Sequence, residues 1–373
     1  MNIGIDLVNL RTVDEGVGRY ARQLISSIST IDKIEKCTLF MDEVVSEQMG
    51  VESPKFQTEI VAVRRGKYEP ANQIYFALGR HTRGLDLLHS PVSVSPLLCP
   101  TKTVVTVHDL AYAYFPDYYT KTAVMYWRFA YRRACRKAAL VLADSDCTKK
   151  DLMNFMGIPE SKISVLYPFV SLPEHRSSEE EIEAVRDNYA LPQRFILHVG
   201  VPHARKNLTT LVKAFKAAKQ EGNFPHKLVL AGPAKGWSFD ALAEEIDRSE
   251  MREEVVFPGY IADNDLPSLY QAADALVFPS MYEGFGYPPL EAMVHGTPVI
   301  VSNVSSIPEV VGDAGLYADP LDHRTFAQQI TRLLSSPELA AELKQKTAAR
   351  AREFSQERMA ENLSRLYEHA LSQ

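Results

Sequence analysis

The chain has 373 residues, more than one hydrophobic core usually serves, so two domains are expected. Its composition, 46% hydrophobic and 24% charged, is typical of a soluble globular protein and contains no apolar run long enough to span a bilayer. A net charge of −6 argues against bulk nucleic-acid binding. The four cysteines show neither C-x-x-C spacing nor the density of a disulfide scaffold, so reduced thiols and no metal cage are expected.

The first half alternates short apolar runs with helical stretches or loops. These runs are rich in β-branched residues and occupy positions 2–8, 37–41, 59–63, 103–107 and 139–143. Runs that are apolar on both faces are typical of a buried parallel sheet. The first run begins almost at Met1, without the basic and long hydrophobic regions of a secretory signal, which favours a cytoplasmic location.

The second half repeats this alternation, and a polar segment separates the two series. The second series of apolar runs occupies positions 194–200, 227–232, 255–260, 275–280 and 298–303. Residues 168–192 are acidic and bounded by prolines, and they include a predicted short helix that ends near Asn188. We therefore predict two doubly wound α/β domains, residues 1–170 and 191–354, joined by a linker over residues 171–190.

The motif GVGRYA, residues 16–21, formally matches the G-x-G-x-x-G/A pattern of a dinucleotide-binding turn. However, its first glycine follows the predicted strand only after the long loop that begins beyond Val8, whereas a dinucleotide turn follows its strand almost at once. A glycine-rich loop whose backbone amides face an anion is therefore favoured over NAD binding.

Open α/β sheets bind ligands outside the carboxyl ends of their strands, which directs attention to His108. His108 directly follows the run 103–107, and it either makes a structural hydrogen bond with Asp109 or the backbone or acts on a ligand. Residues 144–146, DSD, match the D-x-D of metal-dependent sugar transferases. A helix cap within DSDCT is the favoured interpretation, because two acids at this spacing are common by chance.

In GVPHARKNL, residues 200–208, two cations follow a strand-end glycine and precede a predicted helix. Arg205 and Lys206 at a helix start would be repelled by the helix dipole unless an anion lay between them, and phosphate is the natural anion. The alternative is a pair of solvated surface cations. Asn207 is the candidate N-cap of that helix.

EGFGYPPLEAM, residues 283–293, predicts a turn after a strand, followed by a short helix with prolines in its first turn and Gly296 past its end. Glu283 and Glu291 flank the backbone amides of residues 284–287. Glu291 could simply complement the helix dipole, whereas Glu283 has no such structural role. Carboxylates suit paired hydroxyls and helix amides suit phosphate, so a sugar phosphate would use both.

Residues 121–139 form a predicted basic helix, with no acid between Asp117 and Asp144. Three arginines share one helical face beside aromatic residues. They are Arg128, Arg132 and Arg136, and the aromatics are Tyr126, Trp127, Phe129 and Tyr131. This pattern fits an anionic membrane surface, a solvated helix or an anionic acceptor.

Taken in order, these motifs resemble the retaining glycosyltransferases of family 4, the group 1 enzymes, over essentially the whole chain. EGFGYPPLEA carries that family's E-x7-E signature, with GVPHARKN before it and GTPVIVSNVSSIPEVVGDAGLYADP after it. The first half contributes GVGRY, VHDL and LADSDCTKKDL. The resemblance implies the GT-B fold, in which two Rossmann-like domains with parallel sheets face each other across a cleft, and a C-terminal helix at 355–373 that completes the first domain.

The resemblance also implies roles for the singled-out residues. Glu291 would bind ribose, Arg205 and Lys206 the diphosphate, Glu283 and His108 the transferred sugar. The remaining donor contacts would come from Gly16, Gly18, Gly200, Tyr260, Ile261, Phe285, Gly286 and Tyr287. Many relatives carry arginine directly after the strand-end glycine, where this chain has Val201, so Arg205 would replace that cation.

The implied reaction transfers a sugar from a nucleotide-diphosphate donor to a hydroxyl of a glycan or lipid-linked acceptor, with retention and without a metal or other cofactor. GDP-mannose is the expected donor, and cell-surface polysaccharide synthesis at the inner face of the membrane the expected setting. Other donors would be UDP- or TDP-linked glucose, N-acetylglucosamine or rhamnose. More distant alternatives are an epimerase of the same fold, an NAD-dependent oxidoreductase and a non-catalytic sugar-nucleotide sensor.

Overall fold

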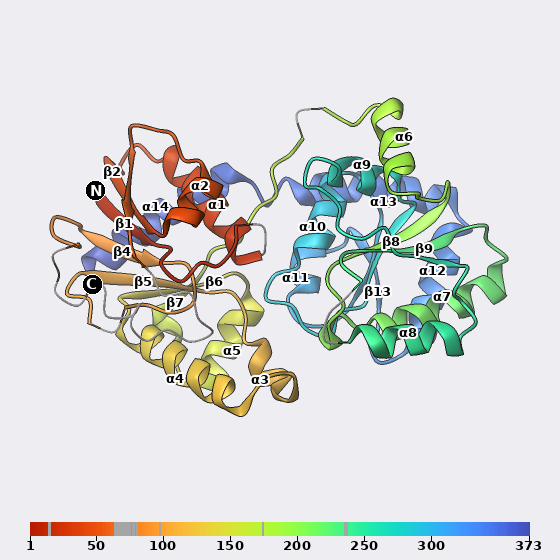
Figure 1. The fold of residues 1–373 in the computed structure, drawn as a ribbon, viewed down its shortest axis with the longest axis horizontal. Coiled ribbons are helices and arrows are strands. Elements are labelled where there is room, and N and C mark those ends of the chain that lie inside the picture. The colour runs from red at the N-terminus through yellow and green to blue at the C-terminus, as the bar shows by residue number, and fades with distance from the viewer. Residues whose placement is uncertain are drawn as a thin grey trace. The chain divides into compact units, whose positions relative to one another are not determined.

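The computed structural model describes residues 1–13, 16–62, 76, 79, 81–96, 98–173, 175–234 and 238–373. The chain forms two compact units, each built around its own parallel sheet (Figure 1). One unit comprises Met1–Phe169 and Phe354–Gln373, and the other comprises Val170–Glu353.

The first unit has a seven-stranded sheet of order β3-β2-β1-β4-β5-β6-β7. Its strands are β1 (Asn2–Asp6), β2 (Lys36–Met41), β3 (Phe56–Ile60), β4 (Leu87–Ser90), β5 (Lys102–Val107), β6 (Leu140–Ala143) and β7 (Ile163–Val165). All pairings are parallel, and the order reverses on either side of β1, as in a Rossmann-like sheet. The carboxyl ends of β4, β5 and β6 are therefore neighbours at one edge.

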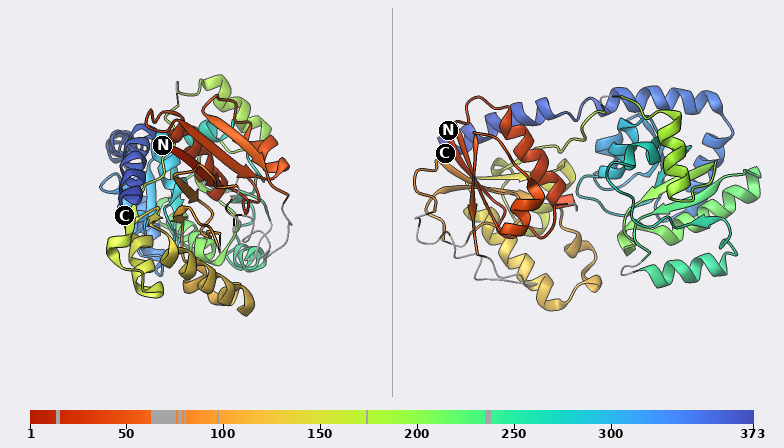
Figure 2. Two further views of the ribbon diagram at one scale, coloured as in Figure 1. Left: turned by 90° about the vertical axis from the view of Figure 1, so that its left-hand side faces the viewer. Right: turned by 45° about the horizontal axis from the view of Figure 1, so that its top comes forward.

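Helices pack against this sheet through their apolar stripes. They are α1 (Gly16–Ser29), α2 (Glu43–Met49), α3 (Ala111–Tyr114), α4 (Lys121–Lys137), α5 (Asp146–Met156) and α14 (Gln356–Ser372), with short 3-10 turns at Pro116–Tyr118 and Glu160–Lys162. The last helix, α14, lies beside α1 and β5 in this unit (Figure 2). Its Tyr367 is fully buried, and the Tyr367 hydroxyl forms a 2.7 Å hydrogen bond with Nδ1 of His89 on β4.

The second unit repeats the arrangement with a six-stranded parallel sheet of order β10-β9-β8-β11-β12-β13. Its strands are β8 (Phe195–Val199), β9 (Lys227–Ala231), β10 (Val255–Val256), β11 (Ala275–Phe278), β12 (Val299–Ser302) and β13 (Gly315–Ala318). Its helices are α6 (Glu179–Asn188), α7 (Leu208–Gly222), α8 (Phe239–Arg248), α9 (Leu266–Ala272), α10 (Tyr287–Val294), α11 (Ile307–Val311), α12 (His323–Leu334) and α13 (Pro337–Ala351), with a 3-10 turn, η4, at Ala204–Lys206. Phe215 of α7 and Phe326 of α12 anchor its hydrophobic core.

The predicted linker 171–190 is wrong over its second half. The helix predicted to end near Asn188 is present as α6, started by a capping box between Ser178 and Glu181. It packs on α9, buries Val185, and so belongs to the second unit rather than to a free connection. The polar composition of this segment favoured a linker, but the capping box and the buried Val185 fix the helix onto the second unit.

Three strands were not predicted from the apolar runs. These are β4, β7 and β13, which have only three or four residues each. β3 begins at Phe56 rather than at the predicted Glu59, and it pairs with β2 from Cys37 onward. The end of that predicted strand, Val63, lies outside the described residues. Short strands carry too few residues for an alternation pattern to mark them.

Candidate functional site

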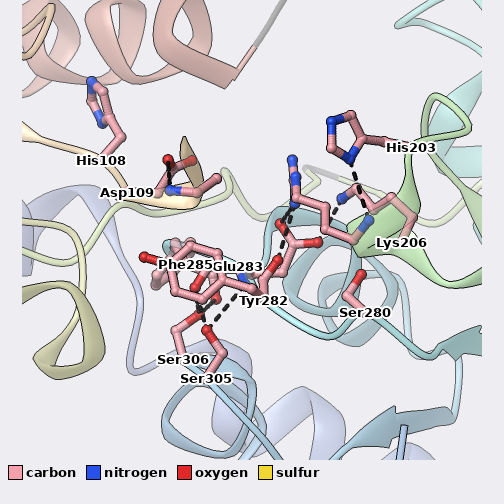
Figure 3. Close-up of polar contacts among 12 residues, drawn as sticks. His108, Asp109, His203, Lys206, Ser280, Tyr282, Glu283, Phe285, Ser305 and Ser306 are labelled. Atoms are coloured by element: carbon pink, nitrogen blue, oxygen red, sulfur yellow. Dashed lines mark hydrogen bonds and ion pairs between the residues drawn. The ribbon is translucent and has the colours of Figure 1, made fainter. Parts of the chain in front are cut away.

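Glu283 lies in the turn between β11 and α10, at the carboxyl end of the second unit's sheet (Figure 3). Gly286 immediately precedes α10 with a φ of 114°, a conformation that favours glycine. Two prolines stand in the first turn of α10, where their missing amide hydrogens cost no hydrogen bond. The predicted order of strand, turn and short helix is therefore confirmed.

Both carboxylate oxygens of Glu283 are paired with cations. Oε2 lies 2.5 Å from Nη1 of Arg205, and Oε1 lies 2.7 Å from Nζ of Lys206. Glu283 and Lys206 are buried, and burial opposes the charge of the carboxylate. Arg205 and Lys206 nevertheless lower the pKa of Glu283 to about 2. The structure thus brings together three of the predicted residues, and the surface-cation alternative for Lys206 is wrong because its side chain is buried.

Neighbouring groups hold the two cations in place at the end of β8. Nη1 of Arg205 also donates to the carbonyl oxygen of Tyr282 at 3.2 Å. The ammonium of Lys206 lies 4.7 Å from the centre of the Phe278 ring, a cation–π contact. Asn207 stands at the predicted N-cap position of α7, but its side chain donates to the carbonyl oxygens of Pro279 and Pro320 rather than capping the helix.

Two serines that the sequence analysis missed fix the backbone on either side of Glu283. Ser305 Oγ accepts from the amide of Glu283 at 3.0 Å, and Ser306 Oγ lies 2.9 Å from its carbonyl oxygen and 2.7 Å from that of Phe285 (Figure 3). Ser306 is fully buried. The only signal in the sequence is a serine pair soon after the run 298–303, since strand-end residues meet at one edge of the sheet.

Glu291 lies on α10, past its first turn, so complementing the helix dipole is not its role. It is buried, and its Oε2 accepts a 2.6 Å hydrogen bond from the hydroxyl of Tyr270 on α9. Tyr270 in turn stacks on His295, with ring centres 5.8 Å apart. Tyr270 positions the carboxylate and was not predicted, because nothing in the run DLPSLYQAADA distinguishes a site tyrosine from a core one.

Three strand-end glycines link β8, β9 and β10 at the same edge. Gly200, Gly232 and Gly259 have φ values of 147°, 143° and 83°. The amide of Gly200 donates to Ala231 at 2.9 Å, and that of Gly232 donates to Gly259 at the same distance. A Cβ atom on Gly232 would overlap the carbonyl oxygen of Gly200, so this turn requires glycine.

The predicted base-contact residues follow Gly259 directly. Tyr260 is 64% exposed, whereas the side chain of Ile261 is buried. The next amide, of Ala262, donates to the hydroxyl of Tyr189 at 3.2 Å, and that hydroxyl donates to Asp265 at 2.7 Å. Tyr189 ends α6, so the segment predicted as a linker supports this loop.

In the first unit, His108 follows β5 and is held by two neighbouring strand ends. Its Nδ1 lies 2.7 Å from Oδ2 of Asp144, and its Nε2 lies 2.6 Å from the carbonyl oxygen of Pro91. Asp109, predicted as a structural partner, instead accepts from the amide of Ala111. The cap interpretation of DSD is confirmed, since Ser145 Oγ accepts from the amide of Thr148 at the start of α5.

The two predicted donor glycines of the first unit differ. Gly18 is buried on α1, and a Cβ atom there would overlap the backbone of Thr12 and Val13, so close packing already requires glycine. Gly16 begins α1, is exposed and has open space around it. A ligand contact at Gly16 stays a prediction.

The basic helix forms as α4, with Thr120 as its N-cap, and it is amphipathic. The three predicted arginines are exposed. Of the four predicted aromatics, only Phe129 is exposed beside the arginines, at 65%. Trp127 and Tyr131 pack on the core of the unit, and Tyr126 is half-buried. Met125, 70% exposed, stands one turn before Phe129.

Across the described ranges, no group of three or more His, Cys, Asp or Glu side chains is arranged to hold a metal ion. Within the same residues, no helix is long and apolar enough to cross a membrane.

Comparison with known families matches both units. Residues 181–350 match the family model of glycosyl transferases group 1, and residues 37–173 match that of glycosyltransferase family 4. The chain is 30% identical over 358 residues to O-antigen chain mannosyltransferase B of Escherichia coli, which covers 92% of this chain and 93% of that protein. It is also 30% identical over 234 residues to O-antigen chain mannosyltransferase RfbU of Salmonella typhimurium, 63% of this chain and 61% of that protein.

Solved structures share the fold at low sequence identity. Anabaena HepE, in complex with UDP and glucose, superposes with a TM-score of 0.77 at 18% identity over 98% of this chain and 99% of that one. WaaG, a glycosyltransferase involved in lipopolysaccharide biosynthesis, gives a TM-score of 0.72 at 18% identity over 98% and 99%. The predicted GT-B fold is confirmed.

Proposed function

Because this chain belongs to the group 1 glycosyltransferases, we propose that it transfers mannose from GDP-mannose to a hydroxyl of a glycan or lipid-linked acceptor. It is a hexosyltransferase of the kind found in polysaccharide and O-antigen biosynthesis. Mannose is supported by the names of the two relatives that are 30% identical to it. A UDP-sugar donor is the second candidate, favoured by the UDP and glucose bound to HepE.

The ion-paired cluster of Arg205, Glu283 and Lys206, of which Glu283 and Lys206 are buried, carries the proposal. Two cations held at the end of β8 suit a diphosphate, and a fully ionised carboxylate between them suits sugar hydroxyls. Glu291, fixed by Tyr270, suits the ribose in the same way. A donor would exchange these internal ion pairs for its own phosphates and hydroxyls, so the site is charged before the ligand arrives.

The mechanism we propose retains the configuration of the anomeric carbon and needs no metal. As the bond to the diphosphate breaks, the leaving group gains negative charge, and preorganised cations stabilise that charge more than they stabilise the bound donor. Lys206 and Arg205 supply this positive charge. The acceptor hydroxyl attacks on the face that the diphosphate leaves, and the departing phosphate takes the hydroxyl proton.

A thermal-unfolding panel of GDP-mannose, UDP-glucose, TDP-rhamnose, ADP-glucose and NAD tests the donor. A ligand at about 100 times its Kd stabilises the folded state by about 2.7 kcal/mol, an upward shift of about 5–10 °C for a unit of this size. The proposal expects the largest shift with GDP-mannose. A larger shift with UDP-glucose would select the second candidate, and a shift with NAD alone would overturn the function.

We also propose that α4 makes peripheral contact with the inner face of the cell membrane. Arg128, Arg132 and Arg136 lie exposed on this helix, and Met125 and Phe129 stand exposed among them. Each cation at an anionic surface contributes about 1 kcal/mol, and the two apolar side chains can enter the interface. A lipid-linked acceptor would be presented at such a surface.

Replacing Arg128, Arg132 and Arg136 together by glutamate is expected to abolish co-sedimentation with vesicles containing 30% phosphatidylglycerol. The change reverses three charges, which at about 1 kcal/mol per cation lowers the binding constant by at least about 100-fold. A matched control reverses three exposed cations elsewhere, Arg248, Arg252 and Arg365, and should leave binding unchanged. Equal binding by the α4 variant and the unmodified protein would remove the membrane contact.

A further inference from the structure

His108 sits where three strand ends of the first unit meet. Pro91 follows β4, His108 follows β5 and Asp144 follows β6, and these strands are adjacent in the sheet. The ring is fixed from both sides, with Nδ1 2.7 Å from Asp144 and Nε2 2.6 Å from the Pro91 carbonyl oxygen. Tyr20 of α1 packs edge-on against it at 4.9 Å. The orientation of the imidazole is therefore set within this unit.

The hydrogen-bond partners of His108 determine the protonation state of its ring. A carbonyl oxygen only accepts hydrogen bonds, so Nε2 of His108 must carry a hydrogen directed at Pro91. An ionised carboxylate also only accepts, so Nδ1 donates to Asp144. With both nitrogens donating, the ring is an imidazolium and has no free lone pair with which to take a proton.

Burial and charge act on this pair in opposite directions. Burial opposes the imidazolium, but the Asp144 carboxylate, its hydrogen bond and the Pro91 carbonyl together raise the pKa of His108 above its usual range. Asp144 is only 3% exposed, and its second oxygen, Oδ1, has no hydrogen-bond partner among the described residues. Burial raises the pKa of Asp144, and the charge of His108 acts against that rise. The carboxylate is thus kept charged chiefly by His108.

We propose that Asp144 is a positioning residue for the transfer reaction, which holds His108 as a hydrogen-bond donor at both ring nitrogens and so excludes it as a general base. This rests on the proposed function, in which the departing phosphate takes the acceptor's proton. His108 then contributes a fixed positive charge at the carboxyl end of the sheet, while both of its N–H groups stay bonded to Asp144 and Pro91. The acidic side chain of the DSD motif thereby acts on the histidine of the VHDL motif.

The protonation state is tested by NMR without any substrate. In the full chain labelled with ¹⁵N-histidine, both nitrogens of His108 are expected to be protonated at pH 8, where an ordinary histidine, with a pKa of about 6.5, is neutral. His108→Gln identifies its signals among those of the 10 histidines. In Asp144→Asn, His108 should become neutral at pH 8. A neutral His108 in the unmodified chain, or an unchanged titration in Asp144→Asn, would overturn the proposal.

The pH dependence of kcat provides a second test of the role of Asp144. If the pKa of His108 in Asp144→Asn falls to about 6.5, about 76% of the ring is charged at pH 6 and about 3% at pH 8, so kcat should fall about 25-fold between these pH values with the donor KM little changed. The unmodified enzyme should keep its kcat over that range. Asp146→Asn, an exposed acid of the same motif, is the matched control and should behave like the unmodified enzyme.

A double variant separates positioning from loss of folding. If Asp144 acts only through His108, adding Asp144→Asn to His108→Gln should lower kcat no further, whereas a purely structural role would add a second loss. A further loss in the double variant contradicts the proposal. Because the NMR arm needs no sugar nucleotide, a failure of the proposed function and a failure of this inference give different results.

Discussion

Replacing Lys206 by alanine is expected to lower kcat for sugar transfer by about 10²–10³-fold, the usual cost of removing one preorganised group that stabilises a developing anion. Lys206 is buried, and its ammonium is held between the Glu283 carboxylate at 2.7 Å and the Phe278 ring at 4.7 Å. In the proposed mechanism it meets a diphosphate whose charge grows as the sugar leaves. The effect should therefore fall on kcat more than on the KM for the donor. Steady-state kinetics with the donor identified by the thermal panel would measure it.

Two controls accompany the Lys206 variant. Lys216→Ala removes a partly buried cation from α7 and should leave kcat unchanged. Lys206→Met keeps the bulk of the side chain over Phe278 and removes only the charge, so it should lose as much activity as the alanine variant if charge is what matters. Circular dichroism and the unfolding midpoint show whether each variant is folded. A folded Lys206→Met enzyme with a kcat within threefold of the unmodified one would contradict the mechanism.

Replacing Gly232 by alanine is expected to lower the free energy of unfolding of the second unit by about 3 kcal/mol or more. Gly232 has a φ of 143°, which L side chains rarely adopt, and a Cβ atom would overlap the Gly200 carbonyl oxygen. Strain of this kind costs about 1–3 kcal/mol, and overpacking against backbone costs a similar amount again. Urea denaturation followed by circular dichroism would measure the loss.

Gly259→Ala is the matched control for the Gly232 variant. Gly259 also has a positive φ, 83°, but a Cβ atom there would meet nothing within 4 Å. It should therefore show only the conformational cost of about 1–2 kcal/mol. Equal losses at the two positions would mean that the close approach to Gly200 contributes nothing.

Most of the architecture could be predicted because buried parallel strands leave continuous apolar runs. Nine of the ten predicted runs lie wholly in described residues and contain or overlap a strand. What escaped was local: three strands of three or four residues, and the packing of the predicted helix α6 onto the second unit. These elements are fixed by pairing with neighbours or by a cap, and such partners are distant or subtle in the sequence.

The residues of the candidate site also divide into those that could be predicted from the sequence and those that could not. Glu283, Arg205 and Lys206 could be found because charged residues directly after strands stand out, and the structure brings them within ion-pair distance. Ser306 and Tyr270, which hold the backbone and the second acid, are ordinary residue types whose role appears only when the chain folds. Asp144 was noticed for its spacing, but its partner is 36 residues away in the sequence.

The position of α14 has a consequence for how this protein is made. The first unit needs Gln356–Ser372, since Tyr367 fills its core and bonds His89, yet these residues are synthesised after the whole of the second unit. Chains emerging from a ribosome usually fold their domains from the N-terminus onward. Here the order is inverted: Val170–Glu353 can be complete first, and residues 1–169 wait with the α14 face of their sheet uncovered. A nascent chain stalled before residue 354 should accordingly be the species most dependent on chaperones.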